Sequence, residues 1–216
     1  MAAEGRRLFL RGVNANGLID YPADYQESLP LSAQDFLAMA ALGFNLVRLP
    51  VSWGRIMPEP GRPDPSSIHQ VTTMVDLAWT QHIYVLVDFH QDNYACTLGP
   101  GRESDGAPDW AVVGQRRWNW RMSGNPAVQT TWSHFWNNAH VHGQGLHAHY
   151  FEAVTAMVEP LVNHPGVLAY DLMNEPDRAG RCRGASRPAI CFRFTATPLS
   201  GSVKSTPSVR SCSSPR

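Results

Sequence analysis

The chain has 216 residues, of which 43% are hydrophobic and 17% are charged, and its formal net charge is zero. These values fit one sizeable globular domain and give no whole-chain reason to expect nucleic acid as a partner. The sequence contains no run of eighteen apolar residues, so we expect no transmembrane segment. Its first fourteen residues contain no long apolar segment, so no signal peptide is expected.

The charges are divided unevenly along the chain. Residues 1–176 hold ten arginines, no lysine and seventeen acids, whereas residues 177–216 hold seven arginines, Lys204 and one acid, Asp177. Three of the four cysteines also lie in the second segment, and none of them forms a CxxC pair. We therefore predict an N-terminal domain over residues 5–176. A basic tail rich in Ser, Pro and Arg follows over residues 177–216, and we predict that it is disordered or read out of frame.

Strands and helices are predicted to alternate along the first segment. Short apolar runs predict strands at residues 8–14, 44–49, 83–89 and 167–173. Helical spacing of apolar residues predicts helices at residues 33–42, 66–82, 126–138 and 146–163, and Ser32 is the expected N-cap of the first. A long loop over residues 91–124 contains three tryptophans, which argue for a packed loop with a function.

The alternation predicts an α/β fold built from parallel βα units. Strands that are almost continuously apolar, such as residues 83–89, are typical of sheets buried on both faces. An open doubly wound sheet and a closed βα barrel both fit this order. No glycine-rich phosphate loop follows the first strand, which argues against a dinucleotide-binding sheet.

Polar residues stand at the end of every predicted strand. Parallel strands share one carboxyl edge, and that edge carries the active site in βα folds. Four such endings are therefore expected to meet in one pocket. In chain order they are Asn14, then Arg48, then Asp88 with His90 and Asp92, and finally Asn174 with Glu175.

Glu175 is the candidate catalytic acid and base. Pro176 disfavours a helical conformation for the residue before it, so Glu175 is expected to be extended. A carboxyl group there can donate a proton to a leaving oxygen and later take one from water. Asn174 offers amide donors and an acceptor to a substrate hydroxyl, provided that the strand end bends to bring both side chains to one site. The alternative is that Glu175 is a solvated acid in a turn.

Three more polar residues are candidates for supporting or binding roles. Arg48 is suited to hold a carboxylate by paired hydrogen bonds, or to form a structural ion pair, with Glu175 as one partner. His90 is suited to bind a hydroxyl or orient a neighbour, and a buried histidine with satisfied bonds is the alternative. Asp92 is a candidate substrate ligand or a loop cap.

Tryptophans and histidines give two weaker signals. Trp53, which follows the second strand, and Trp110, Trp118 and Trp120 are candidate platforms for sugar rings or lipid, although packing within the loop is expected for at least half of them. Five histidines crowd residues 134–149, but the spacing of their two His-x-His pairs makes them diverge on a helix. We therefore predict no metal site.

Four stretches of the sequence together resemble a known enzyme family. They are "GFNLVRLPVSW" (residues 43–53), "VLVDFHQDNY" (85–94), "GAPDWAV" (106–112) and "VLAYDLMNEP" (167–176). Over about residues 5–176 the chain resembles glycoside hydrolase family 5, the cellulase family. Its "DFHQD", "GAPDWA" and "YDLMNEP" stretches are most similar to the endoglycoceramidase-type branch.

The resemblance implies a partial TIM-type (β/α) barrel, of which this chain supplies the first four βα units. It implies a retaining glycosidase in which Glu175 is the acid/base and Asn174 binds the hydroxyl beside the reacting carbon. Arg48 and His90 would support the catalytic carboxylates, and Asp92 would touch the sugar. The implied partner is a β-linked glycan or glycosphingolipid, with no cofactor. Relatives of this kind suggest secretion, whereas this N-terminus carries no signal for it.

The family's second catalytic glutamate has no counterpart in this sequence. It would end the seventh strand of the barrel, whereas the only acid after Glu175 is Asp177. We hypothesise a shifted reading frame or a truncated gene model directly after Pro176. Two hypotheses follow, a glycosidase of the cellulase family and a catalytically inactive half-barrel that binds sugar. Open sheet edges in a half-barrel also predict self-association.

Overall fold

A parallel four-stranded sheet forms the centre of the computed structural model, which describes residues 8–19, 31–98, 106–114 and 126–176. The strand order is β1-β2-β3-β6, and every pair is parallel. The strands are β1 (Gly12–Asn14), β2 (Leu46–Ser52), β3 (Tyr84–His90) and β6 (Val167–Asp171). The four predicted parallel strands are therefore confirmed, with bounds that differ by a few residues.

Helices alternate with the strands of the sheet along the described chain. They are α1 (Ala33–Ala41), α2 (Trp53–Ile56), α3 (Pro65–Thr80), α4 (Pro126–Trp136) and α5 (Leu146–Val158). Ser32 caps α1 as predicted, because its side chain and that of Asp35 each bond the other's backbone N–H. Asp64 caps α3, and Pro65 occupies the first turn of that helix. Single 3₁₀ turns span Cys96–Leu98, Asp109–Ala111 and Glu159–Leu161.

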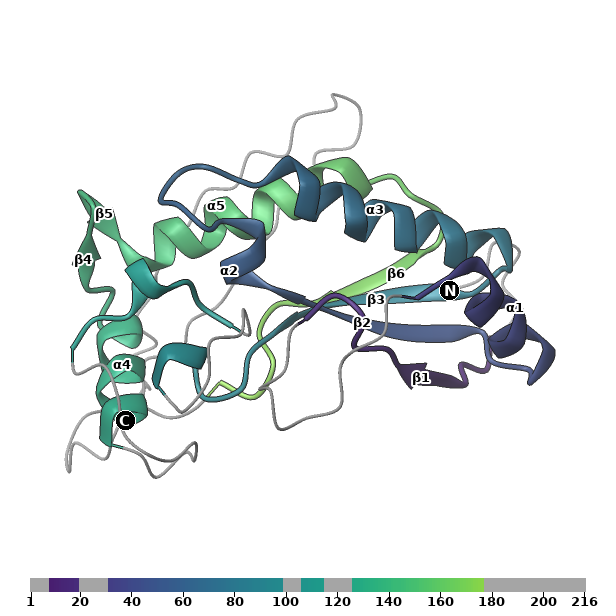
Figure 1. Cartoon of the computed structure of the whole chain (residues 1–216), viewed down its shortest axis with the longest axis horizontal. Helices are drawn as coiled ribbons and strands as arrows, with labels where there is room; N and C mark the ends of the chain where they lie inside the picture. The colour runs from purple at the N-terminus through teal and green to yellow at the C-terminus, as the bar shows by residue number, and fades with distance from the viewer. Residues whose placement is uncertain (1–7, 20–30, 99–105, 115–125, 177–216) are drawn as a thin grey trace, which may run out of the picture.

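The core lies between the sheet and the helices. Alternate residues of β2 and β3, including Val47, Leu49 and Val85, are buried and pack in one apolar cluster with Val71 and Val75 of α3. Figure 1 shows α3 and α5 running along one side of the sheet. The intervening residues of β2 and β3 are half-buried over the first part of each strand. The expectation of strands buried on both faces is thus wrong for these segments, and the second face carries the polar residues described below.

A short hairpin separates α4 from α5, and the sequence analysis did not predict it. Its strands are β4 (His140–Val141) and β5 (Gln144–Gly145). The two central residues, His142 and Gly143, have φ values of 47° and 87°. Positive φ at both positions is the requirement of the type I′ turn, whose twist matches that of the flanking strands. The hairpin therefore takes two of the five clustered histidines out of any helix.

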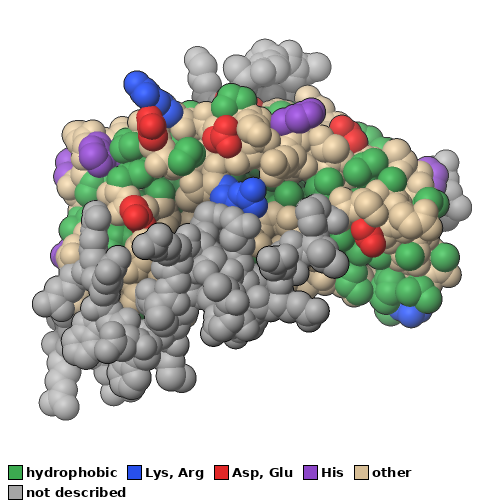
Figure 2. Space-filling model, viewed as in Figure 1, with side chains coloured by type: hydrophobic (Ala, Val, Ile, Leu, Met, Phe, Trp, Pro, Cys, Tyr) green, Lys and Arg blue, Asp and Glu red, His purple; other side chains and the backbone are tan. Residues whose placement is uncertain are grey.

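Exposed hydrophobic side chains gather near the start of the sheet. Phe9 is 83% exposed, and Leu8 and Leu10 are also exposed, close in sequence to β1. Leu37 and Leu42 are exposed in α1 and at its end. Figure 2 shows hydrophobic side chains at the end of the molecule where Figure 1 places α1. None of the described helices is both long and apolar enough to cross a membrane.

Candidate active site

Arg48 lies in the middle of its strand, which corrects the prediction that it ends one. It pairs with Asn14 of β1, and β2 continues to Ser52. The prediction took Pro50 as a strand terminator. However, Arg48 O accepts a hydrogen bond from Ala15 N, so Arg48 and Pro50 both point their backbone groups toward β1. Because β1 has ended beside Arg48, the N–H that proline lacks costs no ladder bond.

The Arg48 guanidinium is the centre of a polar network on the second face of the sheet. Its Nη2 lies 3.0 Å from Asp88 Oδ2 and 3.2 Å from Asp171 Oδ2, and it donates a 2.8 Å hydrogen bond to Asn174 Oδ1. Asp88 is fully buried, so the nearby positive charge offsets much of its desolvation. The ion pair suggested for Arg48 is therefore present, with Asp88 and Asp171 as its partners.

His90 is the last residue of β3 and is held between two carboxylates. Its Nδ1 donates to Asp88 Oδ2 at 2.7 Å, and its Nε2 lies 3.7 Å from Asp92 Oδ1. Burial by itself lowers the pKa of this imidazole. The hydrogen bonds and charges of Asp88 and Asp92 outweigh burial and raise the pKa to about 9. His90 is therefore an imidazolium at neutral pH, with an N–H on each side of the ring.

Asn174 and Glu175 lie in a sharp bend directly after β6. Asn174 is buried, its backbone N–H donates to Phe89 O at 3.0 Å, and its Nδ2 donates to Gln91 O at 3.1 Å. Glu175 has a φ of 38°, so the prediction of an extended residue before Pro176 is wrong. The chain does bend here, because β6 ends at Asp171 and the backbone turns at Glu175. The carboxylate of Glu175 is exposed.

Hydrogen bonds and ion pairs thus link most of the polar site residues that were named from the sequence. Arg48 touches Asn174 directly, and His90 joins the same network through Asp88 and reaches Asp92. Two residues in the network had no assigned role, Asp171 as a partner of Arg48 and Gln91 as a partner of Asn174. Both follow or end a strand of the sheet, and that position was the available signal.

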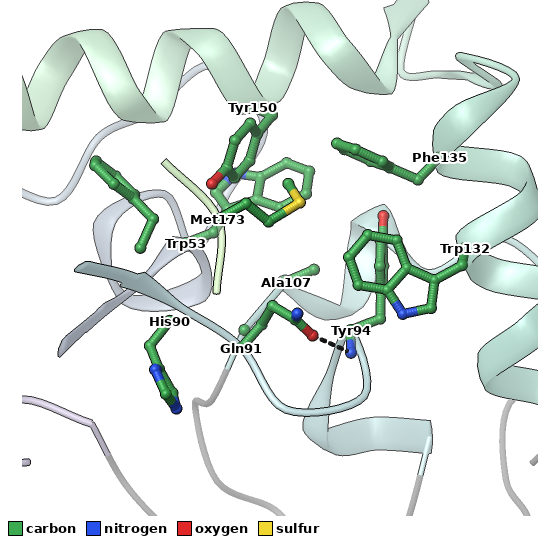
Figure 3. Close-up of a pocket in the computed structure, with 11 residues that line it drawn as sticks. Trp53, His90, Gln91, Tyr94, Ala107, Trp132, Phe135, Tyr150 and Met173 are labelled. Atoms are coloured by element: carbon green, nitrogen blue, oxygen red, sulfur yellow. Dashed lines mark hydrogen bonds between the residues drawn. The ribbon is translucent and has the colours of Figure 1, made fainter. Parts of the chain in front are cut away.

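Trp53 packs inside the protein and does not stand exposed. It is 4% exposed, and its ring centroid lies 5.1 Å from that of Tyr150 and 5.6 Å from that of Trp110 in edge-on contacts. Together with Phe89, Tyr94, Phe135 and other aromatic residues it lines a small pocket that extends to His90 and Gln91. Figure 3 shows Trp53, Tyr150 and Phe135 around Met173, with His90 pointing away from them. Trp118 and Trp120 lie outside the described residues, as does the tail over residues 177–216.

The clustered histidines bind separate neighbours. His134 Nδ1 contacts Val113 O at 2.8 Å, and His149 contacts Val141 O at 3.0 Å and Gln144 Nε2 at 2.8 Å. His147 is buried on α5. Within the described ranges, no three His, Cys, Asp or Glu side chains are arranged to hold a metal ion. This cluster therefore gives no structural support for a metal centre.

A parallel sheet with helices on one face and a polar network at its carboxyl side is the arrangement expected for part of a βα barrel. The model of the cellulase family (glycosyl hydrolase family 5) matches residues 1–186, and the chain belongs to this family. Endoglycoceramidase I of Rhodococcus hoagii (strain 103S) is 31% identical over an alignment of 217 positions, gaps included, that covers 95% of this chain and 41% of that protein.

Solved structures agree with this assignment. An endogalactoceramidase matches with a TM-score of 0.73 and 32% identity over 82% of this chain and 42% of that one. Endo-glycoceramidase II from Rhodococcus sp., in a complex with ganglioside GM3, matches with a TM-score of 0.65 and 31% identity, covering 80% and 41% of the two chains. The partial TIM-type (β/α) barrel is thereby confirmed. The chain spans about two fifths of the length of the curated relative it matches.

Proposed function

We propose that this chain carries the acid/base half of the active site of a retaining O-glycosyl hydrolase. Glu175 is the general acid and base, and Asn174 binds the hydroxyl beside the reacting carbon. The observation that carries the proposal is the 2.8 Å bond from Arg48 to Asn174, the residue before Glu175, in a network that also includes Asp88. That bond fixes the residue next to an exposed carboxylate at the carboxyl edge of a parallel sheet, where βα-barrel enzymes bind substrate.

The chemistry of the neighbouring groups suits a sugar. Asn174 uses one lone pair for Arg48 and one N–H for Gln91 O, so its amide keeps one lone pair and one N–H for a hydroxyl. His90 supplies a positive charge next to Asp92, whose side chain is 45% exposed and accessible to substrate. Trp53 supports the site from within the aromatic core. No step of this chemistry requires a cofactor.

The substrate class follows from the relatives. Their names are those of endoglycoceramidases and an endogalactoceramidase, and one of them is solved with ganglioside GM3. We therefore propose a β-linked glycan or the head group of a glycosphingolipid as the substrate here.

We propose that these 216 residues do not supply the nucleophile of this mechanism. A retaining pair of carboxylates stands about 5–5.5 Å apart across the sugar. Asp88 and Asp171 are held by Arg48, and the only acid after Glu175 is Asp177. The chain alone is therefore proposed to lack turnover. A catalytically inactive half-barrel that binds sugar is the second candidate function, favoured by the same observation.

An assay with an added external nucleophile separates the two candidates. Formate can take the place of the missing carboxylate, and an alkyl β-lactoside needs a proton on its leaving oxygen whereas a 4-methylumbelliferyl β-lactoside barely does. We expect no release from either substrate without formate. With formate, we expect Glu175→Gln to lower release from the alkyl lactoside far more than release from the fluorogenic one. The matched control is Glu152→Gln, an exposed acid of α5.

The outcomes of this assay have distinct meanings. Equal rates for the Glu175→Gln variant and the unmodified chain would contradict the acid/base role. Lactose binding without turnover under any condition would favour the sugar-binding half-barrel. Turnover without formate that depends on Glu175 would show that the chain holds a nucleophile after all.

We also propose that the chain self-associates through its sheet edges. Within the described sheet, β1 and β6 are the outer strands, and exposed apolar side chains at Leu8, Phe9 and Leu10 precede β1. Unpaired strand edges beside apolar surface favour pairing with another chain. Sedimentation velocity over a range of concentrations tests this, and Phe9→Lys is expected to shift the equilibrium toward monomer. A concentration-independent monomer would contradict it.

A further inference from the structure

Gln91 connects the end of β3 to the bend that holds Glu175. The residue is 6% exposed, and its side-chain amide takes part in three hydrogen bonds. Its Nε2 donates to the carbonyl oxygens of Asn174 and Glu175, the second at 3.1 Å. Its Oε1 accepts from Tyr94 N at 2.7 Å, the bond drawn in Figure 3.

The connection runs in both directions. Asn174 Nδ2 donates back to Gln91 O at 3.1 Å, and Asn174 N donates to Phe89 O at 3.0 Å. The two loops are therefore held by side-chain and backbone bonds from each partner. Four hydrogen bonds between buried or half-buried groups fix their relative position far more tightly than one contact does.

Glutamine is the side chain that this arrangement requires. Two carbonyl oxygens converge on one NH₂ group, while a backbone N–H needs an acceptor on the same side chain. Only a side-chain amide offers two N–H donors on one nitrogen together with a carbonyl acceptor, and asparagine is shorter by one methylene. A carboxylate would accept from Tyr94 N but would repel both carbonyls.

The backbone at Glu175 needs such support. A φ of 38° is rare for a residue with a side chain, and conformations of this kind cost about 1–3 kcal/mol. They persist where the surroundings determine them. The carbonyls on either side of the Glu175 N–Cα bond are those of Asn174 and Glu175 itself, and both accept from Gln91.

We infer that Gln91 is the positioning residue that sets the backbone turn of Glu175 and thereby aims its carboxylate. The inference rests on the proposed function only for the role of that carboxylate. Gln91 itself touches no reacting atom. It acts through the carbonyls of the bend.

Gly106 closes the other side of Gln91. Its φ is 80°, and a Cβ added there would collide with Tyr94 O and lie 2.9 Å from Gln91 Cβ. Gly106 O also accepts from Gly54 N at 2.7 Å and from Ser52 Oγ at 3.3 Å. The loops after β2 and β3 therefore share one junction with the bend after β6. A side chain at position 106 is expected to displace Gln91.

Nuclear magnetic resonance of the full chain tests the inference without turnover. Two quantities are measured. The three-bond coupling between the amide proton and Hα of Glu175 reports the φ angle, and the hydrogen exchange rate of the Tyr94 amide reports its hydrogen bond. At pH 8, Gln91→Glu is expected to change the Glu175 coupling while Tyr94 stays protected, because the acceptor remains. Gln91→Met removes donor and acceptor, so it should change the coupling and speed Tyr94 exchange about tenfold. Gln81→Glu, at the end of α3, is the matched control and should change neither.

An unchanged Glu175 coupling in both Gln91 variants would overturn the inference. If those variants fail to fold, a measurement on the unmodified chain still tests the role of Gln91. Couplings across hydrogen bonds should connect Gln91 Nε2 with the carbonyl carbons of Asn174 and Glu175, and their absence would overturn it too. Gly106→Ala offers an independent change and should alter the same Glu175 coupling.

The NMR experiment on Gln91 and the formate assay on Glu175 can fail independently of each other. A chain that hydrolyses nothing contradicts the acid/base role and leaves the backbone result standing. If formate-dependent turnover is present, Gln91→Glu should lower kcat about 100-fold with little change in KM, because a misplaced catalytic group costs about that factor. Equal losses in kcat and in binding would indicate a general structural role instead.

Discussion

Two histidines with little exposed surface, one in the polar network and one in the aromatic core, show how neighbours decide the charge of the same side chain. His90 contacts Asp88 and Asp92, and its pKa is raised to about 9. His147 lies against Phe135, with ring centroids 5.0 Å apart, and neither of its ring nitrogens has a hydrogen-bond partner among the described residues. Burial lowers the pKa of His147, and the nearby Phe135 backbone offsets this only in part.

The difference teaches that burial alone does not set protonation in this protein. Both rings are largely removed from water, yet only the ring beside carboxylates keeps a proton at neutral pH. The polar network is therefore a charged assembly that depends on each member. The aromatic core around His147 depends on staying neutral.

The largest expected effect comes from removing the central cation of the network. Arg48→Met leaves buried Asp88 with only the His90 imidazolium beside it, and it removes the guanidinium that pairs with half-buried Asp171. Removing one partner from a buried network of ion pairs is expected to cost about 3 kcal/mol of unfolding free energy. Urea denaturation at pH 7 measures it.

The matched control for this change is Arg62→Met. Arg62 forms a surface ion pair with Glu59, in which the side chains are 79% and 63% exposed. Its loss is expected to cost about 0.5 kcal/mol or less. Similar losses for the two variants would contradict the assignment of Arg48 as the centre of a buried network.

A smaller effect is expected from titrating His90. Its pKa is raised in the folded protein, so its stabilising contribution is complete below about pH 6.5 and is lost as the pH rises through about 9. The full shift corresponds to roughly 3 kcal/mol, and solvent screening reduces this to about 2 kcal/mol. Urea denaturation at pH 7 and pH 10 should show the loss in the unmodified chain.

His90→Asn should remove most of that pH dependence, whereas His82→Asn, at an exposed position after α3, should keep it. A curve of the same shape for both variants would show that His90 is not the titrating group. In that case the contrast drawn between His90 and His147 would not hold.

The smallest effect is expected from His147, because its ring nitrogens have no hydrogen-bond partner within the part of the chain that the structure describes. Its folded-state pKa is lowered, so stability is unaffected above about pH 6.5 and falls as the pH decreases below that value, where the unfolded chain takes up the proton first. His147→Leu should flatten the stability profile between pH 7 and pH 5. His69→Gln, at an exposed site on α3, should not. An unchanged acid slope in the His147 variant would contradict the prediction.

Sequence-based predictions were correct where a feature depends on residues that are close together in the chain. Apolar runs located the four strands, and the Ser32 N-cap was correct because capping depends only on residues within one turn. Positions at strand ends identified His90, Asp92 and Asn174 as neighbours of one site, because parallel strands share an edge.

Other features depended on contacts between distant segments. Pro50 suggested a strand end, but tertiary pairing continued β2 beyond it. Pro176 predicted an extended Glu175, but bonds from Gln91 impose a left-handed turn there. No pattern in the sequence around Gln91 predicts that its side chain makes these hydrogen bonds. The hairpin at His142 and Gly143 did have a signal, since a two-residue loop with glycine is typical of a type I′ turn.

The pairing of β3 with β6 places the two halves of the site far apart in the order of synthesis. Gln91 and Asn174 are separated by 83 residues, and α4, the β4–β5 hairpin and α5 must emerge between them. On a growing chain, β3 is therefore an open edge until β6 leaves the ribosome. Because such long-range parallel pairing is slow, nascent chains of this protein are expected to need protection from aggregation during that interval.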